Sequence, residues 1–220
     1  MVYELSTCGL IDDIGLSELL QREPRFKEVE FWLGVRELAQ QHLDEAQAHL
    51  TTAFDWHPKW PSAALTLAGV YMTAEDLNGA VRLYDVTLRL FPDLPDAIIG
   101  RVRALSYLGR YTDALAGVDD LARIRWFPGE EAYWRAWNEV QLGRLEDSWT
   151  HVQQAERLWV SADVSKLAGI IAVKRGELAL ARERFETARG LNPADCETLV
   201  HLGGVHARSA GLQACHVGRT

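Results

Sequence analysis

Large apolar and small residues alternate along this chain at helical intervals. In five places a large apolar residue at position i is followed by a small residue at i+3, a large residue at i+7 and a residue at i+10 that is mostly small. These intervals place all four side chains on one face of an amphipathic helix. The pattern therefore predicts five helices that each bury one face, and their first large residues are Leu43, Leu77, Tyr111, Leu145 and Leu178.

The same four columns recur at a nearly constant period. Successive differences between the first large residues are 34, 34, 34 and 33. The first small column contains Ala46, Ala80, Ala114, Ser148 and Ala181. The second large column contains Leu50, Tyr84, Val118, Val152 and Phe185, and the second small column contains Ala53, Thr87, Leu121, Ala155 and Ala188. Self-similarity at such a period indicates a repeat architecture.

Each of these helices is preceded by another predicted helix, as in the stretch SAALTLAGVYM. A further column of mostly small residues runs through these first helices, where a small side chain lets two helices approach closely: Gly34, Ala68, Val102, Ala136, Gly169 and Gly203. Pro58, Pro92 and Pro193 end units, and Pro24 lies one period before Pro58. Because proline stops one helix and is tolerated in the first turn of the next, each unit reads as a helical hairpin.

This period, with small residues at the eighth, twentieth and twenty-seventh positions and proline at the thirty-second, resembles the tetratricopeptide repeat family. The resemblance implies an all-α fold, a right-handed superhelical solenoid of about five 34-residue helix-turn-helix repeats over residues 27–195. Repeats would start near residues 27, 61, 95, 129 and 162. Arg101 and Arg135 replace the usual apolar seventh residue, and proline is missing at the third and fourth repeat ends, so less regular packing is expected there.

Capping segments are expected on both sides of the repeats, because one hairpin cannot bury its own apolar face. Within residues 1–26, the stretch 9–23 has the pattern of the second helix of a degenerate preceding repeat. Within residues 196–220, a helix from Cys196 to about Arg208 would cover the last hairpin. The final GLQACHVGRT lacks a second-helix pattern, which predicts a frayed tail.

Composition and charge narrow the classes of partner. No apolar run approaches the roughly 18 residues of a membrane-spanning helix, so no membrane insertion is expected. The net charge is −8 and no basic stripe occurs, which argues against nucleic acid as a partner. Three scattered cysteines suit a reducing compartment, and no signal peptide is evident at the N-terminus, so we expect a cytoplasmic protein.

A search for catalytic and metal-binding motifs yields no candidate. Phosphate-binding glycine loops, the nucleophile elbow and the H-E-x-x-H motif are missing from the sequence. His42 and His49 are two helical turns apart, too far for one ion without a ligand between them. Cys196, His201 and His206 would point to different helix faces. We therefore expect no enzyme activity, no metal and no cofactor.

The family resemblance implies that the second, fifth, ninth, twelfth and thirteenth positions of the repeats line a concave groove. The candidate groove residues are Phe31, Leu65, Ile99, Arg103, Tyr107, Tyr133, Trp137, Lys166, Ile170 and Lys174. Repeats of this family that grip a C-terminal carboxylate carry Lys and Asn at the fifth and ninth positions. Phe31 and Val35 stand there in the first repeat, which excludes that mode of binding.

Aromatic side chains dominate the predicted groove. Tyr133 and Trp137 are four positions apart and share a helix face. Two such rings left bare would form an apolar patch of the size that marks a partner site, and Arg103 could take a carboxylate. The alternative is that neighbouring hairpins or residues 1–12 cover these rings. Trp60 and Trp159 fall at junctions between hairpins, where a wide ring fills the wedge.

These features predict a non-catalytic scaffold or adaptor that binds a helical or extended peptide segment of another protein. Two further classes stay open. The chain could be the regulatory or sensor module of a larger system, or a structural solenoid that forms homo-oligomers through its end hairpins.

Overall fold

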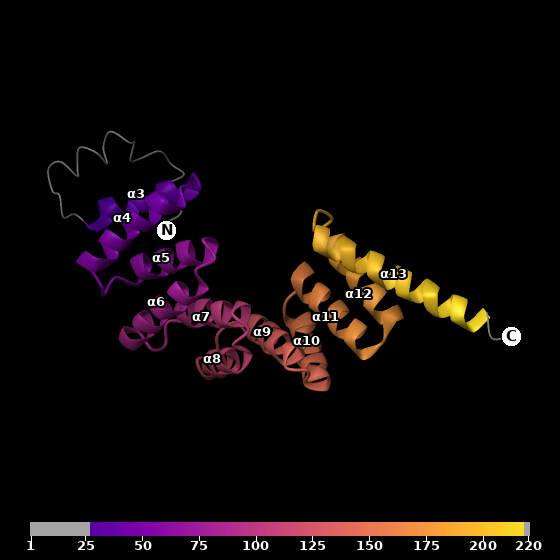
Figure 1. The fold of residues 1–220 in the computed structure, drawn as a ribbon. Helices are drawn as coiled ribbons and strands as arrows, with labels where there is room; N and C mark the ends of the chain where they lie inside the picture. Colours follow the sequence, from indigo (N-terminus) through magenta and orange to yellow (C-terminus); the bar gives the residue numbers. More distant parts are fainter. Residues whose placement is uncertain (1–26, 218–220) are drawn as a thin grey trace. The chain divides into compact units, whose positions relative to one another are not determined.

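The computed structural model describes residues 27–217, with side chains from residue 28 to residue 209. This part of the chain consists of helices joined by short turns and contains no strand (Figure 1). The helices are α3 (Lys27–Ala39), α4 (Leu43–Trp56), α5 (Pro61–Thr73), α6 (Leu77–Leu90), α7 (Pro95–Tyr107), α8 (Tyr111–Arg123), α9 (Pro128–Gln141), α10 (Leu145–Leu158), α11 (Ala162–Arg175), α12 (Leu178–Leu191) and α13 (Cys196–Val217). The predicted all-α fold of paired helices is confirmed.

The helices form two compact units, residues 1–108 and residues 109–220. In the first unit α3 pairs with α4 and α5 with α6, α7 packs on α6, and the first helices α3, α5 and α7 lie in contact. In the second unit α8 packs on α9, α9 pairs with α10 and α11 with α12, and α13 packs on α12. Each unit therefore buries its helix faces between successive hairpins.

The repeated columns of the sequence form the buried core. The first small column and the second small column are no more than 2% exposed at any repeat. The large column between them is also buried, from Val118 and Val152 to the bulkier Tyr84 and Phe185. Helices of this length gain most of their stability from such tertiary packing, so the periodic columns explain why each segment folds where it does.

The size of the residue on the first helix matches the size of its partner on the second. A Cβ atom on Gly34 would lie 2.5 Å from Leu50 Cγ, and one on Gly169 would lie 2.6 Å from Phe185 Cε1. Where the second helix carries the smaller Val152, the first helix has room for Ala136 in the same core cluster. Glycine at the eighth position of these two repeats therefore leaves room for the side chains of Leu50 and Phe185.

The turn inside every hairpin contains one residue in the left-handed backbone region. These residues follow the same period as the core columns, with φ between 60° and 84°: Gln41, Glu75, Gly109, Gly143 and Gly176. Glycine adopts this conformation without steric cost, whereas Gln41 and Glu75 do so against a cost of about 1–2 kcal/mol. The tight turn is thus set by backbone geometry rather than by one side chain.

Arg101 and Arg135, the two departures from the apolar seventh position, form ion pairs with the preceding hairpin. Arg101 Nε lies 2.7 Å from Asp85 Oδ1 on α6, and Arg135 Nη2 lies 2.9 Å from Asp119 Oδ1 on α8. The two aspartates occupy the same repeat position. Each polar pair thus stands where other repeats have an apolar contact between consecutive hairpins.

The expectations for residues 1–26 lie outside the described residues. At the other side, α13 continues to Val217 and so includes the first part of the segment from Gly211 onward that we expected to be a frayed tail. GLQACHV contains no proline that would stop the helix. Leu202 and Val205 of α13 pack on Phe185, and the ring of His201 stacks on Phe185 with centroids 5.0 Å apart.

Candidate peptide-binding surface

One accessible stripe follows each of the first helices α5 and α7 of the first unit. On α5 and α7, residues three or four positions apart stay accessible while the opposite face enters the core. The stripe on α5 contains Ser62, Leu65, Gly69 and Thr73, and the stripe on α7 contains Asp96, Ile99, Arg103 and Tyr107. Because α5 and α7 lie in contact, the two stripes form one surface, which we call the α5–α7 surface.

The α5–α7 surface combines an apolar floor with one exposed cation. Leu65 and Ile99 are half-buried, and Tyr107 is 52% exposed. A Cβ atom on Gly69 would meet no other atom within 4 Å, so the space above this residue is open. Arg103 is exposed beside these apolar residues. An extended or helical segment could place an apolar side chain over Gly69 and a carboxylate on Arg103.

Phe31, another predicted groove residue, belongs to the core instead. Its side chain is only 4% exposed. The ring centroid lies 4.6 Å from that of Trp60, in the loop before α5, and 5.5 Å from that of Trp32. The expectation that Phe31 faces a ligand is therefore corrected: a tryptophan from the junction covers the fifth position of this repeat.

Tyr133 and Trp137 are likewise involved in packing within the second unit. Both are half-buried and pack against the core cluster formed by α9, α10 and α11. The Tyr133 centroid lies 5.8 Å from that of Trp159, in the loop before α11, and 5.2 Å from that of Trp134. Tyr133 is thus covered by a junction tryptophan as Phe31 is, which favours the alternative of internal packing for this ring.

Lys166 serves to hold α13 rather than to present a charge. Its Nζ donates hydrogen bonds to Asp195 Oδ2 at 3.1 Å and to Glu197 Oε2 at 2.9 Å. Desolvation acts to lower the pKa of Lys166, but the bonds to these two carboxylates outweigh it and raise the pKa above its usual value. Of the other predicted residues on α11, Ile170 packs on the core beside α12 and only Lys174 is exposed.

Replacing Asp195 by Asn is expected to loosen α13 at neutral pH. Hydrogen bonds from Thr198 and Lys166 hold the pKa of Asp195 below its usual value. The stability this carboxylate contributes is therefore present above its unfolded pKa of about 3.9 and is lost as the pH falls through the folded pKa. Hydrogen exchange should be faster in α13 of the variant and unchanged in α3–α6. Equal exchange in α13 of both proteins would contradict this role.

Among residues 27–217, no group of three His, Cys, Asp or Glu side chains could hold a metal ion. Two histidines form pairs with a carboxylate on the other helix of their own hairpin. His49 Nδ1 lies 2.7 Å from Glu30 Oε2, and His151 Nδ1 lies 2.7 Å from Glu139 Oε2. Within the described residues, every helix is too short or too polar to cross a membrane.

Comparison with known proteins identifies the repeat. Residues 37–93 match the sequence profile of the tetratricopeptide repeat. The fold matches a thermophilic tetratricopeptide repeat protein of Thermus thermophilus with a TM-score of 0.69 at 18% identity, over 82% of this chain and 99% of that one. MamA from Desulfovibrio magneticus RS-1 matches with a TM-score of 0.67 at 18% identity, over 77% of this chain and 97% of that one.

YrrB, a repeat protein described as having an unusual peptide-binding site, matches with a TM-score of 0.64 at 15% identity, over 88% of this chain and 97% of that one. No curated protein sequence gives a significant match. The stacked hairpins define a helical-repeat protein. Residues 37–93 thus match the tetratricopeptide repeat in sequence, and the described helices share the fold of tetratricopeptide repeat proteins.

Proposed function

We propose that this chain is a non-catalytic adaptor that binds a peptide segment of another protein on the α5–α7 surface. The observation that carries the proposal is the open space above Gly69, between half-buried Leu65 and Ile99 and beside exposed Arg103. The partner segment would be helical or extended, with an apolar residue for this space and an acidic residue for Arg103. The similarity to YrrB, with its peptide-binding site, supports this class of ligand.

Other parts of the predicted groove contribute less to the proposal. Lys174 is exposed and Trp137 and Ile170 are half-buried, so these three can extend a contact surface on the second unit. Phe31, Tyr133 and Lys166 are assigned to packing and to the attachment of α13. The proposed location is the cytoplasm, because the three cysteines of the sequence are scattered and odd in number, as in proteins of reducing compartments.

Gly69→Leu is expected to abolish peptide binding without unfolding the protein. The added side chain enters open space, and leucine favours a helix over glycine by roughly 0.8–1 kcal/mol. Peptides selected from a displayed random library on the wild-type chain would be titrated by fluorescence anisotropy. We expect the Kd to rise at least about tenfold, a loss of about 1.4 kcal/mol.

The matched control is Gly190→Leu on α12, where a Cβ atom also meets nothing within 4 Å. It adds the same side chain to a helix outside the proposed surface and should leave the Kd unchanged. Arg103→Glu should shift the selected peptides from acidic towards basic sequences. Selected peptides that bind the wild-type, Gly69→Leu and Arg103→Glu chains equally well would place the binding site elsewhere.

A further inference from the structure

The third and fourth repeats end with large apolar residues where the other repeats have proline. At the thirty-second position of these two repeats stand Trp126 and Val160. They lie in the loop between α8 and α9 and in the loop between α10 and α11. Trp126 is 39% exposed and Val160 is 81% exposed, so much of this apolar surface is left outside the core.

The two loops lie side by side in the second unit. The ring centroids of Phe127, next to Trp126, and of Trp159, next to Val160, are 6.0 Å apart in an edge-to-face arrangement. A Cβ atom on Gly129 would lie 2.7 Å from Trp159 Cβ, so the start of α9 touches the second loop. The loops therefore form one surface, which we call the loop edge. Its exposed large apolar side chains are Trp126, Phe127, Leu158 and Val160.

The loop edge is basic although the whole chain carries a net charge of −8. Residues 121–129 and 157–162 contain three arginines and no acidic residue. All three arginines are exposed. Arg123 lies 3.6 Å from Asp120, whereas Arg125 and Arg157 take part in no ion pair among residues 28–209. Two cations beside the apolar side chains are thus available to an anionic partner.

The carboxylates that flank these segments already have basic neighbours. Asp120, Glu156 and Asp163 each lie within 3.6 Å of an arginine or lysine side chain. The fourth flanking carboxylate, Glu130, is half-buried at the start of α9. The partner that suits the loop edge therefore combines negative charge with an apolar layer.

We propose that the loop edge binds the surface of an anionic phospholipid bilayer. Tryptophan concentrates at membrane–water interfaces, and arginine binds phosphate oxygens through two parallel hydrogen bonds. Apolar side chains that stand out from loops can enter the headgroup region without a complementary pocket. Binding of this kind needs no spanning helix, and no helix within residues 27–217 could cross a membrane.

A second copy of the chain suits the loop edge less well. In a symmetric contact this surface would meet itself, so the arginines of both copies would come together. Like charges that face each other at an interface oppose binding. The charge of the loop edge therefore favours an anionic surface over self-association. The proposal is independent of peptide binding, because the α5–α7 surface belongs to the first unit.

Flotation of the full chain with lipid vesicles tests the proposal. We expect the chain to float with vesicles of phosphatidylcholine and phosphatidylserine in equal parts, and much less with vesicles of phosphatidylcholine alone. High salt should release it, because salt screens the attraction between arginine and phosphate. A chain that stays in solution with both kinds of vesicle would overturn the proposal and would favour a protein partner for the loop edge.

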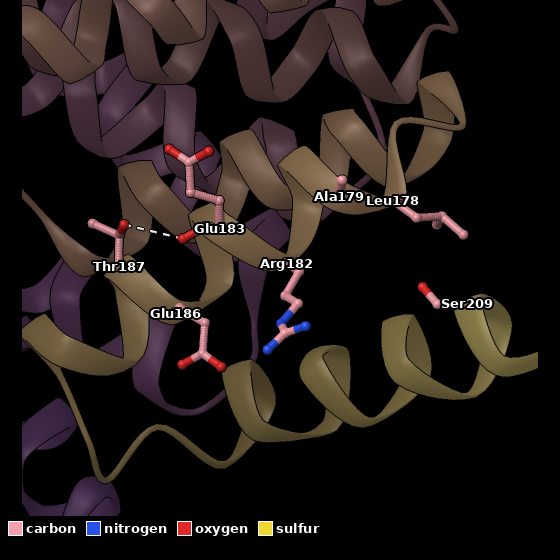
Figure 2. Close-up of a pocket in the computed structure, with 7 residues that line it drawn as sticks. All are labelled: Leu178, Ala179, Arg182, Glu183, Glu186, Thr187 and Ser209. Carbon is pink, nitrogen blue, oxygen red and sulfur yellow. Dashed lines mark hydrogen bonds between the residues drawn. The ribbon is translucent and has the colours of Figure 1, made fainter.

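Arg125→Gln plus Arg157→Gln should lower the partition coefficient for the mixed vesicles about 25-fold, which is about fivefold for each arginine. Gln41 shows that glutamine adopts the left-handed conformation of Arg125. The matched control, Arg182→Gln plus Arg208→Gln, changes the net charge equally at two exposed arginines away from the loop edge. Arg182 extends from α12 towards α13 in a hollow lined mostly by polar side chains (Figure 2). Equal losses in both double variants would refute the site.

Trp126→Ser plus Val160→Ser removes apolar surface and no charge. It should lower the same partition coefficient at least about tenfold. The matched control is Leu142→Ser plus Val200→Ser, at side chains that are 38% and 73% exposed. Leu142 follows α9 at the end opposite to the loop edge, and the control should float as the wild type does. Equal flotation of the two double variants would show that the loop edge does not enter the bilayer.

Discussion

Phe185→Ala should lower the free energy of unfolding of the second unit by about 3–5 kcal/mol. Phe185 is the bulkiest fully buried side chain described, at 0% exposure. Its ring fills the space left by Gly169 on α11 and contacts Leu202 and Val205 on α13. Truncation therefore removes apolar burial from two helix interfaces and leaves a cavity between them, and the side chain of His201 loses its stacking partner as well.

Urea denaturation followed by tryptophan fluorescence measures this loss. Leu191→Ala, at the C-terminus of the same helix and 47% exposed, is the control and should change stability by less than about 1 kcal/mol. Phe185→Leu keeps part of the side-chain volume, so its free energy of unfolding should lie between those of Phe185→Ala and Leu191→Ala. A Phe185→Ala protein as stable as Leu191→Ala would mean that α13 does not pack on α12 as described.

Gly100→Val should cause the second large loss of stability. We expect it to lower the free energy of unfolding of the first unit by an amount at the upper end of about 1–3 kcal/mol. A Cβ atom on Gly100 would lie 2.3 Å from Tyr84 Cζ and 2.6 Å from its hydroxyl oxygen. Tyr84 is buried, and desolvation raises the pKa of its hydroxyl despite the nearby Arg103. The ring cannot move into solvent without giving up its own contacts, so α6 and α7 must separate.

Gly69→Val is the control for Gly100→Val, since it makes the same change on the neighbouring helix α5 where no atom opposes it. Valine and glycine differ by only a few tenths of a kcal/mol in helix propensity, so Gly69→Val should be as stable as the wild type or slightly more so. Thermal unfolding of both variants gives the comparison. Equal destabilisation by the two would show that helix propensity, not the contact with Tyr84, accounts for the loss.

The fold could be predicted because its determinants repeat. Ala46 and Ala181 lie four periods apart and meet the same surroundings, so the columns identify the buried face and the helix pairs together. The left-handed turn residues follow the same period but differ in type, from Gln41 to Gly176, and the side chains alone did not reveal them. Because glycine, glutamine and glutamate all adopt the positive φ angle of this turn, the residue type at the turn position does not reveal the turn in the sequence.

The candidate site could be predicted only in part, because the segments that cover it do not repeat. Trp60 and Trp159 stand at different distances from the start of their repeats, yet each reaches the aromatic ring at the fifth position. The partners of Lys166 lie 29 and 31 residues further along the chain, beyond the hairpin that contains it. Assigning groove residues by their position in the repeat identifies the correct helix face. It does not identify the side chains of neighbouring segments that cover this face.

The matched sizes at the eighth and twenty-fourth positions constrain how these repeats can diverge. Gly34 with Leu50, Ala136 with Val152 and Gly169 with Phe185 fill the gap between paired helices in different ways. At Gly34 and Gly169, a larger residue can be accepted only if the facing Leu50 or Phe185 is replaced by a smaller one in the same step or earlier. Hairpins grafted from one repeat to another should therefore keep their fold when both helices move together, and lose it when a helix bearing glycine is exchanged for one bearing alanine opposite Phe185.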